Sequence, residues 1–569
     1  MSNTTLTPLR RFLNLLKVDR QEIGSIYVYA LFNGIVSLSL PLGIQAIINL
    51  ISTGQMSTTW IVLVAFVIAG VAFTGIMQIM QLTITENLQQ KIFARSAFEF
   101  TYRIPRMKLE FVDKRYIPEL VNRFFDTLSV QKGLSKILMD FSSASLQILF
   151  GLILLSFYHP FFIIFSLLLI TVVYIIFRYT IPRGLKTSLV ESTFKYEVAH
   201  WLEELARTME TFKLAGKTPL PMDKTDEVVH GYLTSRKAHF RTLLVQYINL
   251  VGFKVIIAAS LLIIGSLLVI NEQMNIGQFV ASEIIIILVL SSIEKLIVSV
   301  ETIYDVLTSI EKIGSVTDIP LEYDGGSLET TTGKGMEVEL RNLSYQFHDD
   351  SRPLLKNINL KIGPGEHLCL SGPNGSGKSM LLQLIAGLYD DFTGSLVYDN
   401  LPSGNWNRQT LRSAMGDNLA MGDIFRGSLI ENLTLGKPWI TMDNIKEVTE
   451  MLGIKEFIEN MEDGYETLLL PLGKSLPTNV RLKIILARSV LCNPRLILLE
   501  DSFNRLRRED RESFLDYIFA PERNWTVIAV SNQKSIAKRF DKVAVVNNGE
   551  IEMLSDPSIV DSHPNFQLN

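Results

Sequence analysis

The sequence predicts an all-α polytopic membrane domain with six transmembrane helices, followed by an α/β domain of the P-loop NTPase type. Three features predict this order: long apolar runs in the first half of the chain, short β-branched runs in the second half, and one glycine-rich loop between a strand and a helix. The 569 residues are 47% hydrophobic and 20% charged, which is more apolar than a typical soluble domain.

The composition also excludes several classes of protein. The chain is too apolar to be disordered, and its net charge of -4 lacks the basic excess expected of a nucleic-acid binder. Its two cysteines, Cys369 and Cys492, are too few for a disulfide scaffold or a cysteine-based metal site. Both lie in apolar runs, so we expect buried free thiols.

The membrane-spanning segments come first. Residues 1–22 contain a basic amphipathic stretch over 8–18, which is typical of a helix on a membrane surface. Six runs then approach or exceed the roughly 20 apolar residues that cross a bilayer: 23–51, 59–83, 137–157, 160–183, 246–270 and 276–300. The alternative, a set of buried helices in a soluble protein, is not expected for so many runs.

Charges in the connecting segments predict the orientation. The long connections 84–136 and 184–245 are rich in Lys and Arg, whereas three short ones contain neither: 52–58, 158–159 and 271–275. The positive-inside rule therefore places the long connections and both termini in the cytoplasm. Structureless loops of this length are rare, so we expect the helices to continue beyond the bilayer, with turns near 108–120 and 205–217.

Charged residues inside the predicted spans are further candidates, among them Glu283, Lys254 and Glu294. Glu283 lies roughly 10 Å into the outer half of the sixth span, at 1.5 Å per residue. A carboxylate exposed to lipid is costly, so Glu283 is expected to face a cavity or a partner, and one interpretation places it on a translocation pathway. Lys254 and Glu294 lie at similar depth and are candidates to pair; the alternative is an ordinary interhelical contact or snorkelling.

The composition changes after the membrane domain, which we assign to 23–315. Residues 316–335 are a polar linker rich in Gly and Thr, and residues 336–569 form the predicted α/β domain. Its predicted strands are the β-branched runs 337–345, 354–361, 367–371, 395–399, 495–500, 526–531 and 542–547.

One motif predicts phosphate binding. A strand over 367–371 leads into the pattern G-x-x-x-x-G-K-S, and a helical pattern follows it. Its residues are Gly372, Pro373, Asn374, Gly375, Ser376, Gly377, Lys378 and Ser379. The glycines let backbone N–H groups surround phosphate oxygens at a helix N-terminus, Lys378 reaches the β/γ-phosphates, and Ser379 ligates Mg²⁺. The alternative is a vestigial loop.

Six spans, two long cytoplasmic connections and a C-terminal P-loop domain together resemble an ABC exporter half-transporter over the whole chain. The segment LPLGIQAIINLI is most similar to the bacterial peptide and protein exporters. The resemblance implies a dimer that binds two molecules of ATP with Mg²⁺, each between the P-loop of one chain and the signature motif of the other. The transported substrate is not readable, and no nucleic-acid partner is expected.

Several motifs of this family are altered. Phe347 stands where an aromatic side chain stacks on adenine; the alternative is an aromatic packed in the core. Ala420 replaces a glutamine. The LSGGQ signature is replaced by Leu476, Pro477, Thr478, Asn479 and Val480, where Thr478 or Asn479 is alternatively a simple helix cap.

The acidic pair is reversed and the switch histidine is missing. Counting from Pro494 without a gap, the resemblance puts Glu500 at the Mg²⁺ position and Asp501 at the base, and Asn532 replaces the histidine. A swapped pair in which Glu500 reaches the water and Asp501 the metal is the alternative.

These motifs, intact and altered, leave two possible functions. One is the ATP-binding and permease half of an exporter with slow hydrolysis, as a homodimer or beside an intact partner. The other is a non-hydrolysing structural or regulatory subunit of a heteromeric transporter.

Overall fold

The computed structural model describes residues 7–52, 58–113, 116–327, 335–347, 352–419 and 424–554. Two compact units are present. The first comprises Met1–Pro105 and Arg115–Ile319, and the second comprises Arg106–Lys114 and Pro320–Asn569. The short segment 106–114 therefore belongs with the C-terminal unit, although its sequence neighbours lie in the helical unit.

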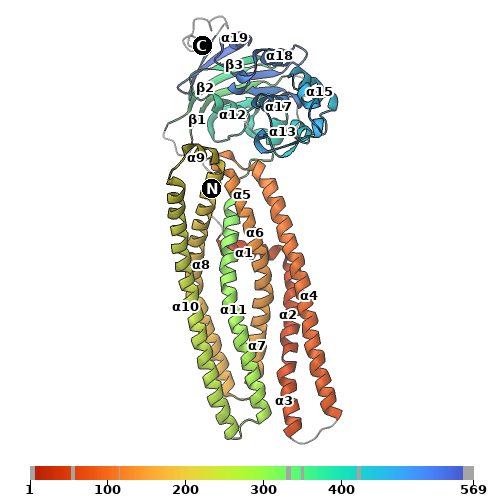
Figure 1. Ribbon diagram of the computed structural model, residues 1–569, viewed down its shortest axis with the longest axis vertical. Helices are drawn as coiled ribbons and strands as arrows, with labels where there is room; N and C mark the ends of the chain where they lie inside the picture. The colour runs from red at the N-terminus through yellow and green to blue at the C-terminus, as the bar shows by residue number, and fades with distance from the viewer. Residues whose placement is uncertain are drawn as a thin grey trace. The chain divides into compact units, whose positions relative to one another are not determined.

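The helical unit contains six described helical stretches that are long and apolar enough to cross a membrane, as predicted (Figure 1). They are Arg20–Ser52 (α2, Arg20–Ser37; α3, Ser39–Ser52), Thr58–Arg106 (mainly α4, Thr58–Arg103), Ile117–Ser156 (α5, Ile117–Asn122; α6, Asp126–Lys136; η4, Ile137–Phe141; α7, Ser142–Ser156), α8 (Phe161–Arg207), α10 (Leu220–Ile270) and α11 (Ile276–Thr317).

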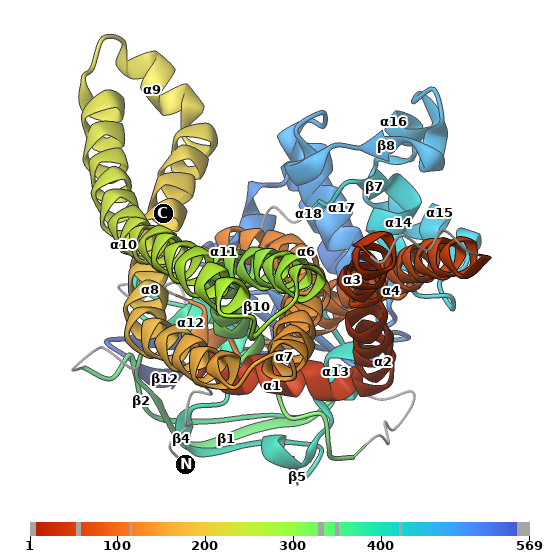
Figure 2. The ribbon, with the colours of Figure 1, turned by 90° about the horizontal axis from the view of Figure 1, so that it is seen from below.

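The helices extend well beyond the apolar runs, which confirms the expectation for the long connections. Helix α8 has 47 residues and α10 has 51, and the short helix α9 (Met209–Ala215) joins them at the predicted turn. At 1.5 Å per residue each long helix exceeds the roughly 30 Å of hydrocarbon about twofold. Figure 2 shows α8 and α10 running side by side into α9.

Helix α11 forms the centre of the helical unit. It packs against α3, α6, α7, α8 and α10, so most of its faces meet protein rather than lipid. The predicted pair is confirmed: Lys254 of α10 forms an ion pair with Glu294 of α11. The amphipathic helix α1 (Pro8–Val18) also packs on α11, where Arg11 pairs with Glu311 and Asp318. One face of α1 is therefore bound to protein.

The C-terminal unit is α/β. A six-stranded sheet has the order β12-β11-β3-β10-β9-β6. The five strands from β11 to β6 run parallel to one another, and β12 pairs antiparallel with β11. A four-stranded antiparallel sheet has the order β2-β1-β4-β5, and β7 pairs with β8. The strands are β1 (Val338–Tyr345), β2 (Leu355–Ile362), β3 (His367–Ser371), β4 (Phe392–Tyr398), β5 (Leu401–Pro402), β6 (Met415–Asp417), β7 (Gly427–Ser428), β8 (Leu468–Leu469), β9 (Leu496–Leu499), β10 (Thr526–Val530), β11 (Lys542–Asn547) and β12 (Glu550–Leu554).

The central strands β3, β9 and β10 are almost continuously apolar because helices cover both faces of the parallel sheet. The helices are α12 (Lys378–Ile385), α13 (Arg408–Ser413), α14 (Leu429–Thr434), α15 (Met442–Met451), α16 (Lys455–Glu459), α17 (Thr478–Leu491), α18 (Arg508–Ile518) and α19 (Lys534–Ala537). Cys369 and Cys492 are buried free thiols, as expected. Since β3, β9 and β10 run in parallel, their carboxyl ends meet at one edge, where ligands bind in open α/β sheets.

Candidate functional site

The glycine-rich loop has the backbone conformation that phosphate binding requires. It connects β3 to α12, and Gly372 and Gly377 have φ angles of 140° and 105°. A Cβ on Gly372 would lie 2.1 Å from the carbonyl oxygen of Val546, so no larger residue fits there. The loop ends at the N-terminus of α12, where free N–H groups favour an anion.

Lys378 lies inside this loop. Its Nζ donates hydrogen bonds to the carbonyl oxygens of Gly372 and Pro373, each at 2.8 Å. Burial lowers the pKa of Lys378, while the carboxylates of Asp501 and Glu500 act in the opposite direction. The ammonium group is thus held at the centre of the loop, close to where phosphate oxygens would bind.

A cavity of about 350 Å³ brings most of the predicted site residues together. Residues 374–379 of the loop, Glu500, Asp501 and Asn532 all line it, although they come from three different strand ends. The first two loop residues, Gly372 and Pro373, are not part of the lining. A hydroxyl and a carboxylate are oxygen donors of the kind Mg²⁺ prefers, and Mg²⁺ usually takes only one or two protein carboxylates beside phosphates and water. The donor set therefore fits Mg·ATP.

The two carboxylates have different surroundings. Glu500 follows β9, and its carboxylate accepts a hydrogen bond from the N–H of Asp501 at 3.3 Å. Asp501 is exposed to the cavity, and its carboxylate accepts a hydrogen bond from the amide of Asn504. The Asp501 carboxylate is therefore bound by a neutral amide donor. The Glu500 carboxylate lies at the start of η8 (Asp501–Arg505), where it accepts from the first N–H of that helix.

Asn418 supports this pair, and sequence reasoning missed it. It follows β6, is only 1% exposed, and accepts a hydrogen bond from the N–H of Glu500 at 2.6 Å. Its Nδ2 donates to Ser502 Oγ at 2.8 Å. The sole signal in the sequence is a polar residue at the end of a short strand, a position that usually faces solvent.

Asn532 is tied to the phosphate loop through both ends of its amide. Its Oδ1 accepts hydrogen bonds from Ser371 Oγ at 2.9 Å and from the N–H of Gly372 at 3.0 Å, and its Nδ2 donates to the carbonyl oxygen of Gly372 at 3.2 Å. The side chain thus supports the loop from behind.

Phe347 is placed against the sheet. It lies just after β1, is half-buried, and packs edge to face on Tyr345 with ring centroids 5.3 Å apart. It does not line the described cavity around Lys378. These contacts favour the packed aromatic of the two interpretations, while part of the ring stays accessible.

The altered signature segment begins helix α17, and neither Thr478 nor Asn479, the alternative helix caps, caps it. Pro477 occupies the N-cap position with extended backbone angles, and no side chain caps the helix. Thr478 and Asn479 are already inside the first turn, so their side chains are past the position from which a cap reaches back. Asn479 Oδ1 is buried without a hydrogen-bond partner in the described part of the chain. Ala420 lies outside the described residues.

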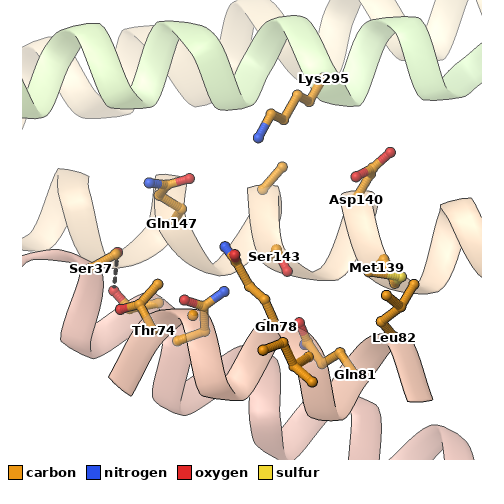
Figure 3. Close-up of a pocket in the computed structure, with 15 residues that line it drawn as sticks. Ser37, Thr74, Gln78, Gln81, Leu82, Met139, Asp140, Ser143, Gln147 and Lys295 are labelled. Carbon is orange, nitrogen blue, oxygen red and sulfur yellow. Dashed lines mark hydrogen bonds between the residues drawn. The ribbon is translucent and has the colours of Figure 1, made fainter. Parts of the chain in front are cut away.

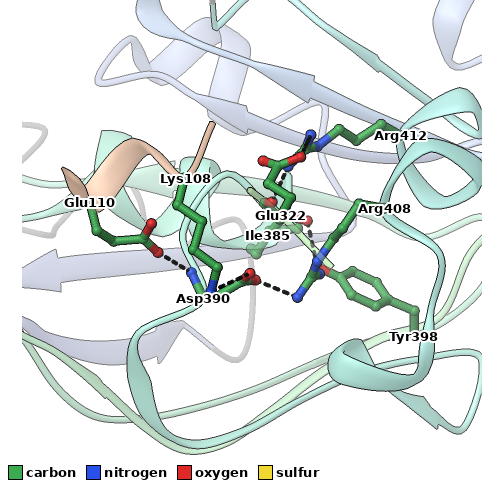
Figure 4. A network of polar contacts seen from close by, with 9 residues as sticks. Lys108, Glu110, Glu322, Ile385, Asp390, Tyr398, Arg408 and Arg412 are labelled. Carbon is green, nitrogen blue, oxygen red and sulfur yellow. Dashed lines mark hydrogen bonds and ion pairs between the residues drawn. The ribbon is translucent and has the colours of Figure 1, made fainter. Parts of the chain in front are cut away.

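The segment 106–114 is bound to the C-terminal unit by a network of polar contacts (Figure 4). Glu110 accepts a hydrogen bond from the N–H of Asp390 at 2.6 Å, and Lys108 lies 3.7 Å from the Asp390 carboxylate, which also pairs with Arg408. Tyr389 donates to Asp113 at 2.9 Å. Part of the turn predicted near 108–120 therefore contacts the α/β domain.

Glu283 is half-buried in α11. Its Oε1 is buried and has no hydrogen-bond partner among the described residues. The role of Glu283 in translocation stays a prediction.

Comparisons with known proteins agree with this architecture. The family described as ABC transporter transmembrane region matches residues 23–293, and the family described as ABC transporter matches residues 355–504. The alpha-hemolysin translocation ATP-binding protein HlyB of Escherichia coli is 26% identical over 377 residues, covering 64% of this chain and 52% of that protein. The leukotoxin export ATP-binding protein LtxB of Aggregatibacter actinomycetemcomitans is 26% identical over 358 residues, covering 62% and 50%.

The chain thus spans about half the length of the curated relatives it matches. Among solved structures, a bacterial Atm1-family ABC exporter with ATP bound superposes with a TM-score of 0.84, covering 96% of this chain and 98% of that chain. The sequence identity is 16%, so this likeness establishes the fold alone.

Proposed function

This chain belongs to the ABC transporter family, and from that premise we propose that it is the ATP-binding and permease half of an exporter. It binds Mg·ATP in the C-terminal unit and couples that binding to movement of the membrane helices. The observation that carries the proposal is the cavity that joins the glycine loop, Lys378, Ser379 and Glu500 in a chain with six membrane-length helices.

Each residue of the cavity has a defined task in this proposal. The loop N–H groups and Lys378 bind the phosphates, and Ser379 and Glu500 hold Mg²⁺, which when bound neutralises phosphate charge. Asp501 orients the attacking water. Asn532 keeps the loop in shape through its contacts with Ser371 and Gly372.

In this proposal the segment 106–114 transmits movement of the C-terminal unit, caused by nucleotide binding, to the membrane helices. It is anchored to the C-terminal unit through Glu110, Asp113 and Lys108, while both of its ends continue into helical stretches of the membrane unit. A displacement of the C-terminal unit on nucleotide binding therefore pulls directly on α4 and on the stretch that begins at Ile117. The turn at α9 is proposed to act in the same way.

The signature segment implies a second half-transporter. In this family it completes the nucleotide site of the partner chain, and here residues 476–480 lack its serine and both glycines. We therefore expect the more active assembly to be a heteromer with an intact half rather than a homodimer. The relatives named for translocation and export support a transporting role over a purely structural or regulatory subunit.

The proposed location is a bacterial inner membrane, with both termini in the cytoplasm. The Lys and Arg excess of the two long connections supports that orientation. It also places the nucleotide site where ATP is available.

The direct test is Mg·ATP binding by the full chain in lipid nanodiscs, with Lys378→Ala as the matched variant. The intact chain should bind a fluorescent ATP analogue in a Mg²⁺-dependent way, and Lys378→Ala should weaken binding at least about tenfold, because it removes a charged hydrogen-bond donor. Equal affinity of the two proteins would reject the proposed site.

A further inference from the structure

The helical unit contains a polar cavity of about 670 Å³ among helices whose spans come from distant parts of the chain. Its walls come from α2, α4, α11 and the stretch formed by η4 and α7 (Figure 3). A volume of this size is typical of small-molecule sites. By the predicted spans it lies in the cytoplasmic half of the bilayer, since Gln81, Asp140 and Lys295 are near the cytoplasmic ends of their spans.

The lining is unusually polar for a membrane interior. It includes one carboxylate, one ammonium group, four side-chain amides and three hydroxyls, which come from Asp140, Lys295, Asn33, Gln78, Gln81, Gln147, Ser37, Thr74 and Ser143. Polar groups at this depth are expensive unless they face water, one another or a ligand.

The two charges are not neutralised by each other. Figure 3 shows Lys295 on α11 and Asp140 on the facing helix, both directed into the space between the helices. Within the described ranges neither side chain forms an ion pair. Glu294, the residue before Lys295, is by contrast paired with Lys254 on another side of α11. The structure therefore separates a satisfied charge pair from two charges that share a cavity.

Two further observations point to a ligand. Asn33 is 7% exposed, and its Oδ1 has no hydrogen-bond partner in the described part of the chain. Burying an amide oxygen in this way costs free energy unless something pairs with it. Asp140 lies in η4, a π-helical stretch that interrupts an otherwise α-helical span, and such stretches are rare and frequent at functional sites.

We propose that this cavity binds a small zwitterionic ligand of the amino-acid or short-peptide class. Asp140 pairs with the ligand ammonium and Lys295 with its carboxylate. Amide side chains both donate and accept, so Asn33, Gln78 and Gln147 are matched to the peptide groups between the two charged ends. This assignment rests on the proposed export function, because the ligand of the cavity is taken to be the substrate that is exported.

The test is equilibrium binding of trialanine to the full chain in nanodiscs of phosphatidylcholine and phosphatidylglycerol. Trialanine with free ends should bind saturably. Asp140→Asn should weaken it about tenfold or more but leave the affinity for N-acetyl-trialanine unchanged, because that peptide has no ammonium group. Lys295→Gln should weaken free trialanine similarly and leave trialanine amide unchanged. Lys254→Gln, which alters a charge outside the cavity, is the matched control and should leave all three affinities unchanged.

Absence of saturable binding at millimolar trialanine would overturn the proposal, as would an equal loss for free and blocked peptides. Loss of peptide binding when phosphatidylethanolamine is added would assign the cavity to a lipid headgroup and also overturn it. Mg·ATP binding, measured on the same samples, shows that each variant is folded. It also separates the two proposals, because loss of peptide binding with Lys378-dependent ATP binding intact rejects only the peptide site.

Discussion

At the scale of single residues, the phosphate loop is complete and its catalytic surroundings are altered. The Nζ of Lys378 donates to the carbonyl oxygen of Gly372, and both the oxygen and the nitrogen of the Asn532 amide form hydrogen bonds with the Gly372 main chain. Glu500 is one methylene longer than the usual metal ligand of the family, and Asp501 one shorter than the usual base. Binding of nucleotide and its hydrolysis are therefore expected to respond differently to substitution.

The first prediction is that the purified chain alone binds Mg·ATP and hydrolyses it slowly. Each exchanged carboxylate is displaced by about 1 Å, and a misplacement of that size can cost on the order of 10²-fold in rate. The measurement is steady-state ATPase in lipid with Lys378→Ala as the blank. A Lys378-dependent turnover near ~1 s⁻¹ or above, in the ordinary enzyme range, would contradict the prediction. Restoration of turnover by an intact partner half would support the heteromer.

The second prediction concerns Asn532. Asn532→Ala removes three hydrogen bonds to Ser371 and Gly372, and about 1 kcal/mol for each predicts that ATP affinity falls by roughly tenfold or more. Asn532→Asp should be worse, because its second oxygen would face the Gly372 carbonyl oxygen and its charge would repel phosphate. Titration with a fluorescent ATP analogue measures both. An aspartate variant that binds as tightly as the native chain would show that Asn532 does not support the loop.

At the scale of elements, close packing of α8 on α11 depends on a glycine. A Cβ on Gly184 would lie 2.2 Å from the ring of Tyr304, which is fully buried on α11. Tyr304 also donates toward Thr180 of α8 and accepts a hydrogen bond from Gln246 of α10 at 2.8 Å. Three long helices thus meet around one side chain.

The third prediction follows from this contact. Gly184→Ala should destabilise the helical unit by about 1–3 kcal/mol, the usual cost of overpacking a filled site. The matched control is Gly252→Ala on α10, whose added Cβ would meet nothing within 4 Å; it should be neutral or slightly stabilising, because alanine favours helix. Thermal unfolding in nanodiscs compares them. Equal unfolding temperatures for the two variants would contradict the packing argument.

At the scale of the whole molecule, orientation in the membrane is the property to test. Lys217 lies in the connection 184–245, which is rich in Lys and Arg. Asn271 lies in the connection 271–275, which contains neither. We therefore expect these two positions on opposite sides of the membrane.

The fourth prediction is that a cysteine at Asn271 reacts with a membrane-impermeant thiol reagent added to intact cells, whereas one at Lys217 reacts only after the cells are opened. The native cysteines give little background because Cys369 and Cys492 are both buried. Labelling of the Lys217 variant in intact cells would overturn the proposed topology.

The sequence alone determined the number of spans, the order of the domains and the phosphate loop. Each of these is a local property: apolar length decides whether a helix can cross a bilayer, and a glycine loop between a strand and a helix has one common conformation. The continuation of α8 and α10 beyond the bilayer was predictable for the same reason, since the connections lack helix breakers.

The tertiary structure alone decided which distant residues share a site. Asp140 and Lys295 lie in apolar runs that are far apart in sequence, and only the packing of η4 against α11 places both in one cavity. The hydrogen bond from Glu500 to Asn418 likewise joins residues far apart in sequence. A sequence pattern shows which face of a helix or strand is apolar and which is polar. Which other element packs on that face depends on the free energy of packing all the elements together.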